Sequence, residues 1–180
     1  MRPASPPPAS PSRRRLIFTG AAGIAALALA RVLQPDPARN AAIARGLSAE
    51  GETIMRALVP ALLDGALPAR APERQAAVAE TVDAISAAVA GLPPPTRDEL
   101  HALFALLAFA PLRIALAGVD AGWDRAELDD ARAFVERLRK SRIPQKRAAY
   151  DALHQLTLAA WYASPRAWPA TGYAGPPKLP

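Results

Sequence analysis

The sequence of 180 residues contains no cysteine, and this absence rules out several kinds of site. Disulfides, thiolate-bound metal ions, iron–sulfur clusters and haem attached through a C-x-x-C-H motif all require cysteine. Histidine is scarce as well, because His101 and His154 are the only two copies. A zinc site ordinarily uses three or four protein ligands at a recognisable spacing, so two isolated histidines do not predict one.

Motifs that hold nucleotides or activate nucleophiles are also missing. The sequence has no G-x-G-x-x-G fingerprint, no Walker loop and no nucleophile elbow. The adjacent acids Asp98-Glu99 and Asp129-Asp130 do not make catalytic pairs, because neighbours on a helix point about 100° apart. We therefore expect no catalytic, cofactor-binding or metal-binding residue in this chain, and no enzymatic activity of its own.

The amino-terminal segment has the order of residues found in export signals. Ser12, Arg13, Arg14 and Leu16 lie in a basic stretch that leads into an uncharged, apolar run ending near Ala30. This pattern predicts a twin-arginine signal over residues 1–30, with a helical apolar part, and hence transport by the twin-arginine translocase to the periplasm. An ordinary signal peptide and a retained membrane anchor are the alternatives, and whether the segment is cleaved stays open.

Most of the chain's positive charge belongs to this segment. The first thirty residues hold four arginines and no acid, so the remainder carries 18 basic and 16 acidic residues, a net charge of +2. This balance does not favour a nucleic-acid partner. The densest basic group of the remainder lies between Arg137 and Arg147, where a solvated helix end, a contact with another protein and a contact with anionic headgroups are all open interpretations.

The rest of the chain predicts an all-α fold. No alternating strand pattern bounded by hairpin turns occurs, so we expect a linker over residues 31–47 and then a bundle-like array of about five helices over residues 48–163. Apolar residues recur at helical spacing, as in Val78, Val82, Ile85 and Val89. The predicted starts are a cap at Ser48, a first-turn proline at Pro72, a capping box at Thr96-Arg97-Asp98-Glu99, a cap at Asp124, and Pro144.

Two features of these helices need further comment. Pro60 is expected to bend the first helix or to end it early. The third helix is apolar nearly all round as far as Leu116, but its uncharged stretch from Ala102 to Leu112 has only eleven residues. Because a membrane span needs about 20 apolar residues, we expect this helix at the centre of the bundle.

Residues 164–180 form a segment rich in proline, glycine and aromatic residues, which we expect to be extended. Its rings either seal the end of the bundle or dock onto a partner, since Trp and Tyr are enriched in interface hot spots. Both roles are compatible if Trp161 points inward and the later rings point outward. The residues predicted for a partner interface are Trp161, Tyr162, Trp168, Tyr173 and Pro176.

This carboxyl-terminal segment resembles a known family. It is similar to the end of the gluconate 2-dehydrogenase subunit 3 family, the small subunits of flavin-dependent sugar and alcohol dehydrogenases. The residues that carry the similarity are Trp161-Tyr162-Ala163-Ser164-Pro165, then Trp168, then Gly172-Tyr173-Ala174-Gly175-Pro176-Pro177. The twin-arginine start, the Leu58-Val59-Pro60 turn and Arg139-Lys140-Ser141-Arg142 also resemble that family.

The resemblance implies a non-catalytic accessory subunit. Such a subunit binds a large FAD-dependent dehydrogenase of the glucose–methanol–choline type and escorts it, already folded, through twin-arginine export. FAD is then expected in the partner and no cofactor in this chain. A cytochrome c subunit as a third component, the substrate of the partner and an association with the membrane stay open. The alternative is a stand-alone exported helical binding module, periplasmic or tethered to the membrane.

Overall fold

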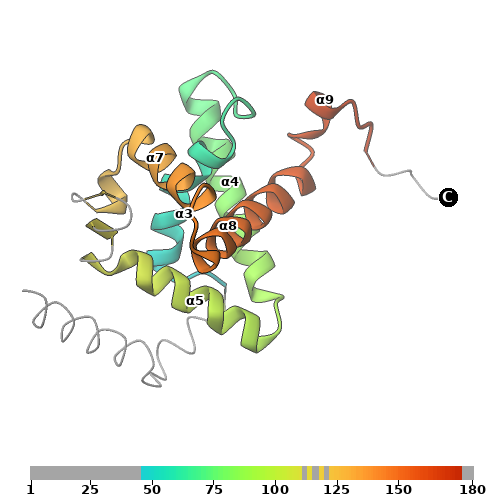
Figure 1. The fold of residues 1–180 in the computed structure, drawn as a ribbon. Helices are drawn as coiled ribbons and strands as arrows, with labels where there is room; N and C mark the ends of the chain where they lie inside the picture. The colour runs from blue at the N-terminus through green and yellow to red at the C-terminus, as the bar shows by residue number, and fades with distance from the viewer. Residues whose placement is uncertain (1–45, 111–112, 115–117, 120–121, 176–180) are drawn as a thin grey trace, which may run out of the picture. The chain divides into compact units, whose positions relative to one another are not determined.

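The computed structural model describes residues 46–110, 113–114, 118–119 and 122–175. The chain divides into two units, residues 1–35 and 36–180, and all described residues belong to the second. Their elements are α3 (Ala49–Leu62), α4 (Ala71–Ala90), α5 (Pro94–Ala108), the 3-10 turn η2 (Trp123–Arg125), α7 (Leu128–Arg139), α8 (Pro144–Ala163) and α9 (Trp168–Thr171). The predicted all-α class is confirmed, since the described part of the chain holds five long helices and no strand (Figure 1).

Several predictions lie outside the described residues. The predicted export signal, with Ser12, Arg13, Arg14 and Leu16, lies outside the described residues. Residues 31–45 of the predicted linker lie outside them as well. Pro176 also lies outside them, near the carboxyl end. These assignments therefore stay predictions.

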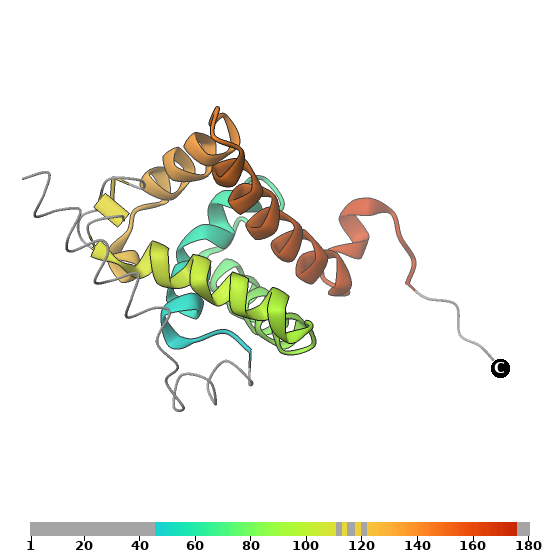
Figure 2. The ribbon, with the colours of Figure 1, turned by 60° about the horizontal axis from the view of Figure 1, so that its bottom comes forward.

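Helix α3 is the centre of the helical domain. Its side chains Ile54, Met55, Leu58 and Val59 are almost completely buried. The helix contacts α4, α5, α7, α8 and η2, and Figures 1 and 2 show it among these elements. Because the apolar residues of every other long helix turn toward it, α3 organises one continuous core.

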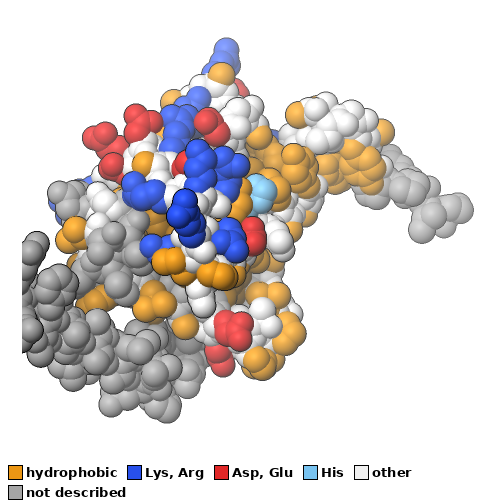
Figure 3. Space-filling model, viewed as in Figure 1, with side chains coloured by type: hydrophobic (Ala, Val, Ile, Leu, Met, Phe, Trp, Pro, Cys, Tyr) orange, Lys and Arg blue, Asp and Glu red, His pale blue; other side chains and the backbone are white. Residues whose placement is uncertain are grey.

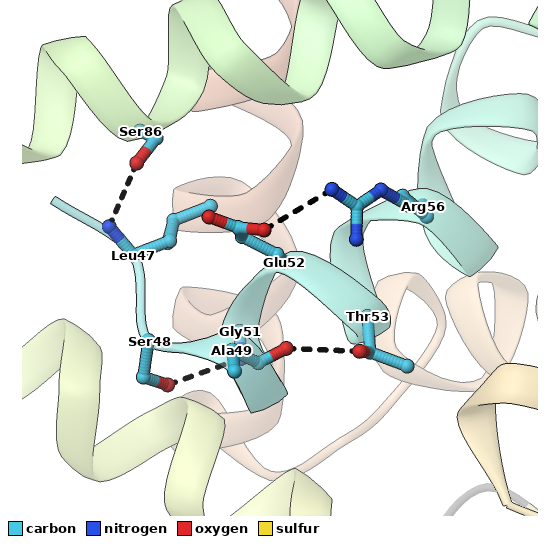
Figure 4. A network of polar contacts seen from close by, with 8 residues as sticks. All are labelled: Leu47, Ser48, Ala49, Gly51, Glu52, Thr53, Arg56 and Ser86. Atoms are coloured by element: carbon cyan, nitrogen blue, oxygen red, sulfur yellow. Dashed lines mark hydrogen bonds and ion pairs between the residues drawn. The ribbon is translucent and has the colours of Figure 1, made fainter.

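The chain enters α3 through a fixed turn, shown in Figure 4. The Ser48 hydroxyl accepts a hydrogen bond from Gly51 N at 3.1 Å, which confirms the predicted cap. One residue earlier, Leu47 N donates to Ser86 Oγ of α4 at 3.0 Å. Gly46 has a φ of +123°, and a Cβ atom there would lie 2.6 Å from the carbonyl oxygen of Ser86. Only glycine fits this approach to α4 without strain.

Pro60 stands in the last turn of α3, which ends two residues later at Leu62. A proline in this place removes a single hydrogen-bond donor from the helix. The helix still closes beyond it, because Leu63 N donates to Val59 O at 2.9 Å.

The prediction for the second helix is confirmed, and that for the start of the third is wrong. Pro72 lies in the first turn of α4, whose predicted apolar face is buried. The capping box at Thr96 to Glu99 does not form, because α5 begins at Pro94 and its cap position is Pro93. Prolines fit the first turn of a helix, where an N–H has no partner within the helix. The proline run therefore begins the helix instead of preceding it.

Asp124 does not cap a helix as predicted. It lies in η2, and α7 begins four residues later at Leu128, with Glu127 at its cap position and no side-chain cap. The reason is Trp123, which is 6% exposed and holds η2 in the core. Its Nε1 donates to Leu107 O at 2.8 Å, and its ring meets Phe134 edge-on with centroids 5.3 Å apart.

The last two long helices follow the sequence pattern closely. In α7 the acids lie in the first turn and the bases in the last, as the helix dipole favours. Helix α8 begins at Pro144 and ends at Ala163 with Ser164 at its cap position, as predicted. Helix α5 ends at Ala108, earlier than expected. The prediction that it lies at the centre of the bundle is wrong, because α3 occupies that place and much of α5 is partly exposed. Within the part of the chain that the structure describes, no helix has the length and hydropathy needed to cross a membrane.

Candidate interaction surface at the carboxyl end

The four described rings of the predicted interface occupy different environments. Trp161, on the last turn of α8, is 5% exposed and belongs to the core. Tyr162 follows it about 100° further round the helix and is 51% exposed, and Tyr173 is equally exposed. Trp168 is partly exposed. Trp161 is therefore buried, whereas the other three rings are accessible to solvent.

Trp168 and Tyr173, beside the backbone carbonyl of Tyr162, form a surface that we call the ring cluster. The Trp168 and Tyr173 rings pack edge to face with centroids 5.3 Å apart, and Trp168 Nε1 donates to Tyr162 O at 3.1 Å. Tyr173 N also donates to Trp168 O at 3.1 Å. The prediction that residues 164–180 are extended is wrong for residues 168–171, because these form the single helical turn α9.

Two glycines shape the ring cluster. Gly172 ends α9 with a φ of +69°, the left-handed conformation that turns Tyr173 back toward Trp168. Gly175 has a φ of +97°, and a Cβ atom there would lie 2.9 Å from Cζ3 of Trp168. The backbone at Gly175 thus lies directly against the indole ring, so the cluster is ordered by the chain's own contacts.

Arg166 attaches the segment between α8 and α9 to the helical domain. Its guanidinium forms two hydrogen bonds with the Glu80 carboxylate on α4, at 3.0 and 2.8 Å. The hydrogen bond from Arg166 lowers the pKa of Glu80, and the guanidinium charge lowers it further. The next residue, Ala167, is buried. The sequence contained no signal for this pair, because 86 positions separate its members.

A groove of about 310 Å³ lies between α4 and α8, beside this attachment. It is lined mainly by methyl and methylene groups, with the hydroxyls of Thr81 and Ser164 and the Glu80 carboxylate among them. The lining residues are Ala77, Glu80, Thr81, Ala84, Ala160, Trp161, Ala163 and Ser164. In Figure 3 hydrophobic side chains lie over the second half of α8 and over part of α9.

The structure offers little for catalysis or metal binding. The described residues hold no group of three or more His, Asp or Glu side chains that could bind a metal ion. His154 stacks on Tyr150 with ring centroids 5.2 Å apart, and His101 is buried in α5. A second hollow of about 290 Å³ lies between α3, the end of α5 and η2, with Glu50 and Asp124 in its lining. No paired arrangement of these carboxylates with a nucleophile or a base is present in the described residues.

Comparisons with family models, with curated proteins and with solved structures found no match to this chain.

Proposed function

We propose that this chain is a non-catalytic accessory subunit that binds a FAD-dependent dehydrogenase of the glucose–methanol–choline type and escorts it through twin-arginine export. The observation that carries the proposal is the ring cluster: the accessible rings of Trp168 and Tyr173, ordered by contacts within the chain, at the end of a helical domain. Rings that are ordered before binding lose little conformational entropy when a partner covers them.

The predicted signal supports the same proposal. The twin-arginine route carries folded cargo, which suits a flavoprotein loaded with its cofactor in the cytoplasm. Because this chain supplies no cofactor motif, the cargo that needs the route is the partner. Binding the folded form of the partner also stabilises it by mass action.

The first experiment is a pull-down of the full chain, tagged after Pro180, from its native host. Flavin absorbance in the eluate together with a large second polypeptide is the expected result. Changing both Trp168 and Tyr173 to Ala should remove that polypeptide while the helical circular dichroism is kept. Leu128→Ala is the matched control, because Leu128 is an exposed hydrophobic residue on α7, away from the cluster. A colourless single chain from the unmodified protein contradicts the proposal.

The export step is tested separately with Arg13→Lys plus Arg14→Lys. Flavin dehydrogenase activity should then stay in the cytoplasm, whereas Arg2→Lys, outside the motif, should leave export unchanged. If the activity still reaches the periplasm in the double variant, the escort role is wrong even when the complex forms.

One observation favours a second candidate function. The groove between α4 and α8 is an open hollow between helices, a feature typical of a stand-alone binding module. The pull-down separates the two functions, because such a module needs no flavoprotein and yields a colourless eluate.

A further inference from the structure

Positive charge is concentrated at the connection between α7 and α8. Residues 136–147 contain six basic residues and one acid, a net charge of +5. The whole of residues 31–180 carries only +2, so the remainder outside this segment is net −3. We call residues 136–147 the basic loop segment. This one short stretch therefore sets the sign of the net charge of residues 31–180.

The carboxylate of Glu136 neutralises little of this charge. Arg139 binds both of its oxygens at 2.8 Å, and Lys140 Nζ binds one of them at 2.6 Å. One acid is thus divided between two cations. Arg142 and Lys146 make no ion pair with any described residue. In Figure 3 the Lys and Arg side chains gather near the middle of the visible face, over α7 and the start of α8.

An exposed isoleucine lies at the centre of this charge. Ile143, at the cap position of α8, is 49% exposed and follows Arg142 directly. Its backbone N–H donates to Ser141 Oγ at 3.1 Å, which orders the loop. Arg147 Nη1 donates to Ser141 O at 2.9 Å, so that basic side chain folds back over the same loop. A large aliphatic side chain in this position adds almost nothing to the domain core.

We propose that the basic loop segment docks on an anionic lipid surface, with Ile143 inserted at the headgroup level and the surrounding basic side chains against phosphates. Proteins that bind at a membrane interface combine an apolar side chain with Lys and Arg. Burial of the apolar side chain and attraction of the basic side chains to anionic lipids both strengthen the binding. Neither of the two hollows described above is lined by this segment. Figure 2 shows the turn between α7 and α8 at an edge of the helical domain, accessible to a flat surface.

The position of the segment leaves the ring cluster available. The basic loop segment lies at the first turn of α8 and the ring cluster follows its last turn. A helix of 20 residues is about 30 Å long, so the two surfaces are well separated. Lipid docking is therefore compatible with a protein bound at the ring cluster, and it does not depend on the proposed escort function.

The absence of cysteine allows a local test in the full chain. Ile143→Cys, labelled with an environment-sensitive fluorophore, is mixed with vesicles of phosphatidylcholine, with or without phosphatidylglycerol. The expected result is a blue shift with the anionic vesicles only. Tyr162→Cys, equally exposed at the other end of α8, is the matched control and should not shift. Because the label reports its own surroundings, vesicle binding by the predicted signal does not produce this difference.

Charge variants test the electrostatic part, with the label kept at position 143. Arg142→Gln plus Lys146→Gln should weaken anionic vesicle binding by about 25-fold, at about fivefold for each basic residue. Glu136→Gln, which frees Arg139 and Lys140, should instead strengthen it by about fivefold. A general loss of structure would weaken binding in both cases. The local shift should disappear at about 1 M salt, where the Debye length is about 3 Å.

Three results would overturn the proposal. The first is the absence of any shift at position 143 with anionic vesicles. The second is a shift of equal size with phosphatidylcholine alone, because charge then plays no part. The third is a fluorophore that does not shift on vesicles together with an acidic polypeptide that the unmodified chain captures and the Arg142 and Lys146 double variant does not. The basic loop segment would then bind a protein and not a lipid surface.

Discussion

Replacing Trp123 with Phe tests the packing at the end of α5. The last carbonyls of a helix have no partner inside the helix. Among them, Leu107 O accepts the indole N–H of Trp123 at 2.8 Å in a buried setting. Phe keeps an aromatic ring opposite Phe134 but removes the donor. The substitution therefore removes one hydrogen bond between two segments of the core, together with part of the buried indole ring.

The magnitude follows from burial. Leaving a buried acceptor without its donor costs about 1–3 kcal/mol, and we expect about 2 kcal/mol of lost unfolding free energy. For a domain of this size that loss lowers the melting temperature by roughly 8 °C. Trp168→Phe is the matched control, because Trp168 also donates its indole N–H to a carbonyl, that of Tyr162, but at an exposed site. Water replaces that bond, so the expected cost is below about 0.5 kcal/mol.

The assay is urea unfolding followed by circular dichroism at the helical band, since fluorescence would change with the substituted tryptophans themselves. Both variants should show the same dependence on urea concentration, with the midpoint lowered only in Trp123→Phe. Equal destabilisation by the two substitutions would refute the reasoning, because the difference in burial would then have no energetic effect.

Two further predictions concern stability. Gly46→Ala should cost at least about 2 kcal/mol by the same unfolding assay, because the positive φ is combined with a steric conflict with Ser86 O. Gly65→Ala, with a φ of +79° and no neighbour within 4 Å, should cost only about 1 kcal/mol, and an equal cost at the two sites would contradict the Ser86 contact. Hydrogen bonds from Arg139 and Lys140 lower the pKa of Glu136 from 4.5 to about 2. Because the folded-state pKa is the lower one, the stability contributed by Glu136 is complete above about pH 4.5 and is lost as the pH falls through 2. Carboxyl titration by NMR measures this pKa, and an ordinary value would show that the two cations do not hold the carboxylate.

Much of the fold was predictable because the helices carry local signals. The spacing of Val78, Val82, Ile85 and Val89, the hydroxyl of Ser48 and the position of Pro144 act within one or two turns of the chain. The two errors in helix capping have a common cause, since capping residues were assigned by their type alone. Asp124 is a good cap by composition, but the burial of Trp123, which depends on Leu107 and Phe134, sets the local conformation instead.

The candidate surface was predictable only in part. The aromatic composition of residues 161–173 indicated a surface of this kind, and an inward Trp161 was one of the arrangements that the sequence left open. The contact between Arg166 and Glu80 and the approach of Gly175 to Trp168 were not predictable. Both depend on the path of the chain after α8, which no local pattern specifies.

The central place of α3 has a consequence for the order of events during synthesis. This helix leaves the ribosome before the other described helices, yet two of its contacts are with α7 and α8, which follow it by about a hundred residues or less. The part of its apolar face that α7 and α8 cover therefore stays exposed until almost the whole chain has been made, and folding is completed only after translation. A predicted signal at the start of such a chain is exposed well before there is a folded domain to transport. Timing of this kind favours an export route that waits for the folded protein over one that threads the chain as it emerges.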